Sequence, residues 1–320
     1  MALAELTGGS VYATVINPSR VREVFSQADL VVAVGTPLFS QFLDTGESLI
    51  PDDVPILHLD ESGWEAGKNL AVAVAVVGGL RDACRELVTL LGERSDEAYE
   101  EAAQRRRQAA ANRKEAARQR LADQLSTGDS REILPLALMA AIREIAPSDT
   151  VIVDEAITNS VALHRVFEFS TPGSLYGYRG GALGWGMPGA LGVQLALPNR
   201  PVVAILGDGA SMYTFQALWT AAHYDLPVKY ILCNNRSYEI LKANMTDYLG
   251  EATEPSHFLE MDLTDPTIDF ASLSRACGVK ATTVQRLDQL NDALRVAFAA
   301  PGPHLVDVIL SGLHRHYAAA

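Results

Sequence analysis

Two polar clusters, each directly after an apolar run, carry the clearest chemistry in the sequence. Residues 202–206 suit a buried strand and end on Gly207-Asp208-Gly209. Residues 228–233 suit a second strand and end on Asn234-Asn235, with a predicted helix over residues 213–223 between the two strands. Parallel strands require such a crossover. Both clusters are therefore expected at the carboxyl edge of one sheet, where open α/β sheets bind ligands.

The residue types at this edge predict a site for a divalent cation and a diphosphate. Asp208 offers an anionic oxygen, Asn235 an amide oxygen, and the turn after Asn235 returns the backbone carbonyl of Ser237 to the same point. Mg²⁺ prefers such an incomplete oxygen shell, because it keeps waters and completes its octahedron with phosphate oxygens. Glycines permit close approach of a diphosphate, and a helix N-terminus directs N–H groups at it. The residues expected there are Gly207, Gly209, Ala210 and Ser211.

The combination of the two clusters is more informative than either alone. A lone Gly-Asp-Gly is more often an ordinary turn, but its pairing with Asn-Asn is far more specific. Gly-Asp-Gly, a helix, a strand and then Asn-Asn resembles the thiamine diphosphate (ThDP) fingerprint of the 2-oxo acid decarboxylase and acetolactate synthase superfamily. Residues 192–196 and 217–222 are most similar to benzoylformate decarboxylase. The resemblance is strongest over residues 154–309, runs with gaps over almost the whole chain, and implies ThDP and Mg²⁺ as cofactors.

Composition limits the class of protein. The 320 residues suffice for two domains, and 48% hydrophobic with 20% charged residues is ordinary for an α/β protein. A net charge of −13 argues against nucleic acid, whose backbone requires a basic surface. Cys84, Cys233 and Cys277 show neither metal-ligand spacing nor a paired framework, and no signal peptide or membrane-spanning run is visible. A cytoplasmic protein is therefore expected.

The pattern of strands and helices predicts an α/β chain with three parts. The resemblance identifies residues 1–92 as part of a Rossmann-like middle domain and residues 130–320 as a doubly wound, parallel-sheet domain that binds the ThDP diphosphate and Mg²⁺. Residues 93–129 are predicted to form a charged helical linker. Strands are expected at residues 11–16, 30–34, 55–59, 70–77 and 151–153, and helices at residues 18–28, 80–91 and 132–145.

Two further polar features have plain structural interpretations. Asp60, at a predicted strand end, could contact a ribose, but no Gly-x-Gly-x-x-Gly precedes it and a turn or helix cap explains it better. The run Arg105-Arg106-Arg107 could bind an anion, although a solvated face is more common in such a mixed-charge helix. Nothing in the sequence supports FAD in the middle domain.

Two segments of the second domain could complete the cofactor site. A predicted strand leads into Thr158 and Asn159, which could bind diphosphate oxygens or cap a helix, and both interpretations stay open. Four glycines within residues 180–186 permit close backbone approach to a ligand or tight helix packing. By resemblance, the carbonyl of Gly181 would accept a hydrogen bond from the cofactor's amino group, and Leu183 would press the cofactor into its V-shaped conformation.

Residues 238–248 are expected to cover the active site, with Tyr238 against the cofactor. Pyruvate decarboxylases carry a catalytic glutamate at the position of Leu241, whereas the benzoylformate decarboxylase pattern is apolar there, as is this chain. The resemblance therefore favours a bulkier or more apolar 2-oxo acid, or a carboligation, over decarboxylation of pyruvate. Ile240 and Leu241 would line the substrate site, unless they are plain packing residues.

No residue of this chain is expected to activate the cofactor. ThDP chemistry needs a glutamate beside the pyrimidine ring, and the superfamily places it in an N-terminal domain that has no counterpart here; Glu155 lies on the diphosphate side. We therefore expect the diphosphate-binding subunit of a split enzyme, which decarboxylates or carboligates 2-oxo acids through an enamine. A second polypeptide would supply the glutamate, the pyrimidine-binding domain and the rest of the middle domain, in a dimer of heterodimers. The alternatives are a truncated chain and a non-catalytic binding or regulatory subunit.

Overall fold

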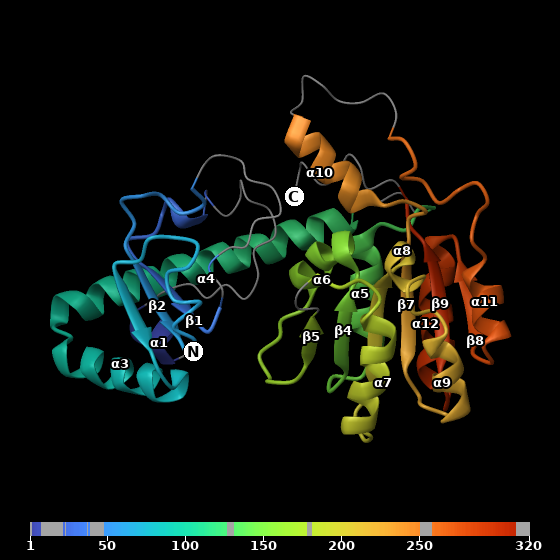
Figure 1. Ribbon diagram of the computed structural model, residues 1–320, viewed down its shortest axis with the longest axis horizontal. Helices are drawn as coiled ribbons and strands as arrows, with labels where there is room; N and C mark the ends of the chain where they lie inside the picture. Colours follow the sequence, from blue (N-terminus) through green and yellow to red (C-terminus); the bar gives the residue numbers. More distant parts are fainter. Residues whose placement is uncertain are drawn as a thin grey trace. The chain divides into compact units, whose positions relative to one another are not determined.

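The computed structural model describes residues 2–7, 22, 24–36, 38, 48–126, 131–177, 181–249 and 258–311. The chain divides into two compact units, Met1–Arg120 and Leu121–Ala320. Both units are α/β with parallel sheets, as predicted (Figure 1). The predicted domain boundaries after residues 92 and 129 stay predictions. Across the described ranges, no helix has both the length and the apolar character that crossing a membrane would need.

The first unit contains a three-stranded parallel sheet in the order β1-β2-β3. In β1, buried and exposed side chains alternate, because successive residues of a strand point to opposite faces. The strands are β1 Val31–Val34, β2 Ile56–Asp60 and β3 Val74–Val77. The buried core of this unit consists of Val31, Ala33, Leu38, Ile50, Val54 and Ile56.

One predicted strand of the first unit is too long. The apolar run 70–77 was expected to be extended throughout, but β3 begins only at Val74. Its partner β2 begins at Ile56, so residues before Val74 have almost no strand to pair with, and a single bond joins the Ala73 N–H to the Ile56 carbonyl at 2.9 Å. The predicted strand 11–16 and residues 18–21 and 23 of the predicted helix 18–28 lie outside the described residues.

The helices of the first unit include α1 (Ala2–Thr7) and α3 (Leu80–Arg94), which contact each other. The long helix α4 (Glu97–Ser126) lies where a helical linker is predicted, and the division between the two units falls within it. Ala103 is its one buried residue, as expected of a polar helix without an apolar stripe. Arg105 pairs with Glu101 one turn away at 3.6 Å, so the solvated interpretation of this basic run holds.

The second unit contains a six-stranded parallel sheet in the order β5-β4-β6-β7-β9-β8. β6 and β7 are neighbours, so the crossover predicted between the two polar clusters is confirmed. The strands are β4 Val151–Glu155, β5 Leu175–Gly177, β6 Val202–Gly207, β7 Lys229–Asn234, β8 Lys280–Val284 and β9 His304–Ile309.

Helices cover both faces of this sheet, which confirms the doubly wound architecture (Figure 1). Successive residues of β4 point to opposite faces of the sheet: Ile152 packs in the core on one face, and Val153 packs in the core on the other. One face is covered by α5 (Pro135–Ile145), α6 (Ser160–Val166) and α12 (Leu287–Ala299). The other is covered by α7 (Gly186–Ala196), α9 (Ala217–His223) and α11 (Phe270–Ala276).

Two predicted helices begin later than expected. The helix predicted from residue 132 begins at Pro135, because proline suits the first helical position, where its missing N–H costs nothing. The helix predicted over residues 213–223 begins at Ala217 and is preceded by a separate short helix, α8 (Asp208–Ser211). Between the two helices the chain continues in tighter turns, in which the N–H of Tyr213 donates to the Ala210 carbonyl at 3.3 Å and that of Thr214 to the Ser211 carbonyl at 3.4 Å.

Candidate functional site

The carboxyl ends of β6 and β7 bring Asp208 next to the turn that follows Asn234. The two strands are parallel neighbours, with Gly207 opposite Cys233. Asp208 begins α8, and its Oδ2 accepts a hydrogen bond from the backbone N–H of Arg236 at 2.7 Å. The structure thus joins the two clusters that the sequence predicts at one edge, and Figure 1 shows α8 at this end of the sheet.

Asp208 is a buried carboxylate that bonds to backbone N–H groups. It is 3% exposed, and its Oδ1 accepts from the N–H of Gly209 at 2.8 Å. No lysine, arginine or histidine in the described ranges pairs with it. Burial raises the pKa of Asp208 to about 6, against the lowering effect of the Gly209 and Arg236 N–H groups. A buried acid without a cation is a cost to the fold alone, and it suits a metal ligand.

The turn after β7 holds the other predicted metal ligands. Arg236 has a positive φ of 57°, which is uncommon for a residue other than glycine. Oδ1 of Asn235 accepts from the N–H of Ser237 at 3.1 Å and closes an Asx turn. The N–H of Tyr238 donates to the Met261 carbonyl at 2.9 Å. These bonds keep Asn235 and Ser237 in one tight turn. Arg236 lies at its centre and donates its N–H to Asp208.

Behind this turn lies a buried polar network that the sequence analysis did not predict. Nδ2 of Asn234 donates to Oδ1 of Asp307 on β9 at 2.8 Å, while Oδ1 of Asn234 lies 3.3 Å from the Arg236 N–H. Oδ2 of Asp307 accepts from the Thr283 hydroxyl at 3.4 Å. The signal in the sequence was a single acid inside the apolar strand β9, because a buried carboxylate needs hydrogen-bond partners.

The carboxyl end of β4 supplies a third segment of the site. Oδ1 of Asp154 accepts from the N–H of Ala156 at 3.0 Å and from the hydroxyl of Ser160 at 2.8 Å. Ile157, inside the turn so formed, has a φ of 52°, a rare conformation for a β-branched residue. Strained positions of this kind persist where the surrounding structure imposes them and cluster at functional sites.

The predicted diphosphate ligands Thr158 and Asn159 lie in this turn, within the 3₁₀ segment η1 (Ile157–Asn159). Both side chains are buried. Asn159 occupies the N-cap position of α6, yet its side chain makes no capping bond, and its Oδ1 has no hydrogen-bond partner within the described ranges. The amide of Asn159 is therefore not committed to the helix start that follows it.

The glycine-rich segment adopts a loop that ends at the start of α7. Gly181 and Gly184 have φ values of 72° and 91°, which only glycine adopts readily. Leu183 lies between them with its side chain 43% exposed. Glu155, the last residue of β4, is fully buried and accepts from the N–H groups of Gly184 at 2.6 Å and Gly186 at 2.9 Å. Burial raises the pKa of Glu155, while these N–H groups lower it.

The remaining predicted cofactor residues lie in α8. A Cβ on Gly209 would approach the ring of Tyr238 to 2.7 Å, so the close contact of these two residues requires glycine. Ala210 and Ser211 are buried, and the hydroxyl of Ser211 donates to the carbonyl of Asp208 at 2.7 Å. The side chain of Ser211 is therefore engaged within α8 itself.

The predicted substrate residues Ile240 and Leu241 lie in α10 (Glu239–Leu249). This helix contacts η1, which carries Thr158 and Asn159. Ile240 is half-buried, whereas the Leu241 side chain is 48% exposed, so plain core packing does not account for Leu241.

Two protein-family models match this chain. The thiamine pyrophosphate enzyme, central domain, matches residues 8–87, and the thiamine pyrophosphate enzyme, C-terminal TPP binding domain, matches residues 156–308. The chain belongs to the thiamine pyrophosphate enzymes. Thiamine pyrophosphate is ThDP, so the predicted superfamily is confirmed. The C-terminal match covers Asp208, the turn after Asn234, the glycine-rich loop and η1.

Known ThDP enzymes resemble the chain over part of their own length. Benzoylformate decarboxylase of Pseudomonas aeruginosa is 34% identical over 174 residues, 54% of this chain and 32% of that protein. The acetolactate synthase large subunit of Pyropia yezoensis is 29% identical over 296 residues, 88% of this chain and 46% of that protein. The solved structure of the ThDP-dependent 4-hydroxybenzoylformate decarboxylase of Rhodococcus jostii RHA1 matches 92% of this chain and 51% of its own, with 27% identity and a TM-score of 0.73. The chain spans about half the length of these relatives, or less.

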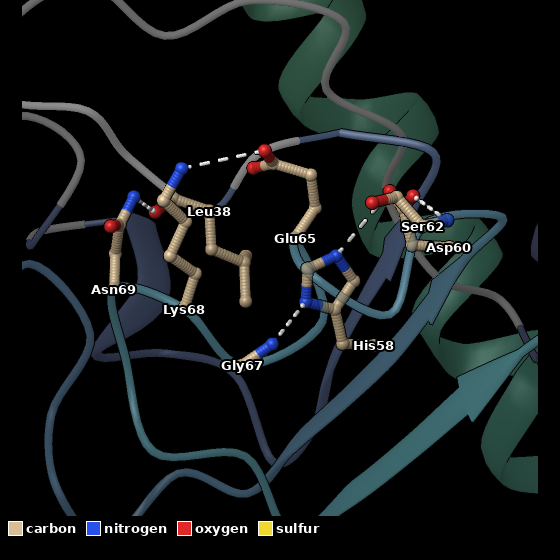
Figure 2. Close-up of polar contacts among 8 residues, drawn as sticks. All are labelled: Leu38, His58, Asp60, Ser62, Glu65, Gly67, Lys68 and Asn69. Carbon is tan, nitrogen blue, oxygen red and sulfur yellow. Dashed lines mark hydrogen bonds and ion pairs between the residues drawn. The ribbon is translucent and has the colours of Figure 1, made fainter.

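The part of this chain that matches the central domain has a polar cluster of its own at the carboxyl end of β2 (Figure 2). Oδ1 of Asp60 accepts from the N–H of Ser62 at 2.8 Å, so Asp60 caps a turn, as predicted. His58 is fully buried; its Nδ1 accepts from the Gly67 N–H at 3.2 Å, and its Nε2 lies 3.8 Å from Oδ2 of Asp60. These contacts hold residues 61–69, and nothing in them requires a ribose.

Proposed function

We propose that this chain is the Mg²⁺- and diphosphate-binding part of a split ThDP enzyme that acts on 2-oxo acids by decarboxylation or acyloin-type carboligation. The observation that carries the proposal is the carboxylate of Asp208. It is buried, it has no cationic partner in the described ranges, and it lies against the turn that carries Asn235 and Ser237. A carboxylate, an amide and a carbonyl form the oxygen set that Mg²⁺ accepts beside phosphate oxygens.

The residues of the site fit a bound ThDP–Mg²⁺ on observations independent of the family. Asn159 is buried and its Oδ1 has no hydrogen-bond partner in the described ranges, so a rotated amide could turn its NH₂ group to donate to a phosphate oxygen. Gly181 has a positive φ and is exposed close to the exposed Leu183, so its backbone is open to a ligand. When bound, ThDP supplies the carbanion-stabilising chemistry of the reaction. The residues of this chain would bind it, orient it and exclude water.

Activation of the cofactor is assigned to a partner. Glu155 contacts the glycine-rich loop directly, and both of its oxygens already accept N–H groups of that loop. It is fully buried and has no free oxygen to share with a pyrimidine ring. A second polypeptide with the pyrimidine-binding domain and the rest of the middle domain would supply the missing glutamate, in a dimer of heterodimers.

The apolar side chains of α10 support a bulky or apolar 2-oxo acid. Leu241 is about half exposed on a helix that contacts η1, and Ile240 precedes it. Relatives of this chain are named as decarboxylases of benzoylformate and 4-hydroxybenzoylformate, both aromatic 2-oxo acids. An acetolactate synthase-type carboligation stays within the proposal, because the Pyropia relative carries that name.

Substitution of Asp208 tests the metal site. Asp208→Ala should abolish Mg²⁺-dependent ThDP binding, since the single charged protein ligand is lost. Calorimetric titration of ThDP with and without Mg²⁺ measures it. Asp262→Ala is the matched control, because this exposed acid pairs with Lys242 close to the same turn and should leave affinity unchanged. Unchanged affinity in Asp208→Ala would contradict the metal assignment.

Experiments on the chain alone test whether it needs a partner. We expect negligible turnover of 2-oxo acids, and a chain that is poorly soluble or self-associated, because an uncovered apolar surface associates. Size-exclusion chromatography with light scattering gives the state, and a keto-acid panel gives the turnover. A stable 34.4 kDa monomer, or ordinary enzyme rates from the pure chain, would rule out the split arrangement. ThDP binding without turnover in any partner complex would point instead to a non-catalytic subunit.

A further inference from the structure

Glu155 is a buried carboxylate whose bonds all lead to one loop. Its Oε1 accepts from the N–H of Gly184 at 2.6 Å and its Oε2 from the N–H of Gly186 at 2.9 Å. The N–H of Trp185, between them, also stabilises the charge. Bonds from N–H groups to a charged acceptor are stronger than neutral ones, so Gly184 and Gly186 are fixed to the end of β4.

The loop is shaped around this carboxylate. A Cβ on Gly186 would lie 2.7 Å from Oε2 of Glu155 and 2.5 Å from a methyl of Leu206. A Cβ on Gly184 would lie 2.5 Å from the Cβ of Tyr213, and the φ of Gly184 is 91°. Glycine is therefore required at both positions that donate to Glu155.

A second hydrogen bond holds the same loop, and it comes from a residue that follows the loop in the sequence. The hydroxyl of Thr214, in the segment between α8 and α9, donates to the carbonyl of Gly184. Gly184 is thus bonded through its N–H to β4 and through its carbonyl to the segment that follows Asp208. Leu183, which immediately precedes this doubly bonded residue, carries a large exposed apolar side chain.

The residue before Glu155 has a different task. Asp154 is also a buried carboxylate of β4, but it bonds to Ala156 and Ser160 and so closes the turn that carries Thr158 and Asn159. Successive residues of a strand point to opposite faces, which separates the two carboxylates. The last two residues of one strand therefore hold two separate segments of the site.

We propose that Glu155 is a positioning residue for the thiamine half of the cofactor and Asp154 for its diphosphate half, an inference that rests on the proposed function. Glu155 acts through the backbone of residues 184–186 and fixes where Leu183 and Gly181 meet the ligand. Asp154 acts through η1. The roles of Glu155 and Asp154 can be tested separately, because the hydrogen bonds of Glu155 lead to Gly184 and Gly186 and not to the turn that carries Thr158 and Asn159.

The experiment compares two ligands on the full chain. ThDP and inorganic pyrophosphate, each with Mg²⁺, are titrated by calorimetry into the wild type and into Glu155→Gln, Thr214→Val and Asp154→Asn. Glu155→Gln turns one acceptor into a donor that faces a glycine N–H. We expect it to weaken ThDP binding at least about tenfold, the order expected for a lost charge-assisted bond, with pyrophosphate affinity unchanged.

The other variants keep the proposal testable if Glu155→Gln does not fold. Thr214→Val removes the second anchor of the same loop with little change in volume and should weaken ThDP alone, by a smaller factor. Asp154→Asn should weaken both ligands by a similar factor. Equal losses for both ligands in Glu155→Gln and Thr214→Val, or no loss in either, would overturn the assignment of Glu155. A wild type that binds neither ligand would contradict the proposed function itself, and the two failures are therefore distinguishable.

Discussion

The carboxyl edges of the two sheets carry similar residues but use them differently. At the end of β2, Asp60 and His58 each accept a backbone N–H of the following segment, and they lie 3.8 Å from each other. At the end of β6, Asp208 also accepts backbone N–H groups, but it is buried with no histidine, lysine or arginine paired with it in the described ranges. The first edge sets its carboxylate beside a histidine, whereas the second leaves its carboxylate with backbone N–H groups alone in the described ranges.

This difference separates a structural polar cluster from a binding site. Buried carboxylates are retained at a cost to stability when function needs them, and the raised pKa of Asp208 records that cost. Nearby, Ile157 and Arg236 adopt positive φ, and Oδ1 of Asn159 has no hydrogen-bond partner in the part of the chain that the structure describes. Strained backbone, a buried carboxylate without a cationic partner and an amide oxygen without a hydrogen bond thus lie at one edge of one sheet in the described ranges.

The largest expected effect on stability is at Gly186. Gly186→Ala should lower the free energy of unfolding by about 3 kcal/mol, since the added methyl group would overlap Leu206 and Glu155. Gly63→Ala, beside the Asp60 cluster, should change it by less than about 0.5 kcal/mol, because the nearest side-chain atoms lie 3.9 Å away. Chemical denaturation measures both. Gly192→Ala, in α7 with open space around it, controls for the substitution itself.

The next effect concerns pH and Asp208. Its folded-state pKa of about 6 exceeds its ordinary value of 3.8, so the folded chain binds more protons between these values and stability falls as pH rises through that window. Without metal, the free energy of unfolding of Asp208→Asn relative to the wild type should rise by about 2 kcal/mol from pH 4 to pH 7.

Denaturation of both proteins at pH 4, 5, 6 and 7 tests this second prediction. Taking the difference between variant and wild type cancels the buried carboxylates of Asp154, Glu155 and Asp307, which the substitution leaves in place. A difference that stays constant with pH would mean that the charge of Asp208 costs the fold nothing. The contrast with the β2 edge would then be lost.

The smallest expected effect on stability is at Asp60, at the carboxyl end of β2. Asp60→Ala should lower the free energy of unfolding by about 1 kcal/mol, the usual value for a lost side-chain cap. ThDP affinity should not change, because Asp60 belongs to the central domain's own turn. Thermal denaturation and ThDP calorimetry on the same preparation measure both quantities. Weaker ThDP binding in Asp60→Ala would show that the β2 edge also serves the ligand.

The sequence by itself determined the local parts of this protein. The apolar runs before Gly207 and Asn234 and the helix between them implied parallel neighbours, because a crossover of that length connects few other arrangements. The meeting of Asp208 with the turn around Arg236 followed from that rule, and the structure confirms it at 2.7 Å. The family resemblance rested on these same residues.

Tertiary structure alone decided which distant side chains complete the edge. Asp307 bonds to Asn234 because β9 lies beside β7, a strand order that periodicity does not encode. Glu155 reaches Gly184, 29 positions along the chain, because the glycine-rich loop folds back over the end of β4. Hydrophobic pattern tells which face of a strand is buried, but a buried carboxylate finds its partner only when the sheet order and the loops between strands are set.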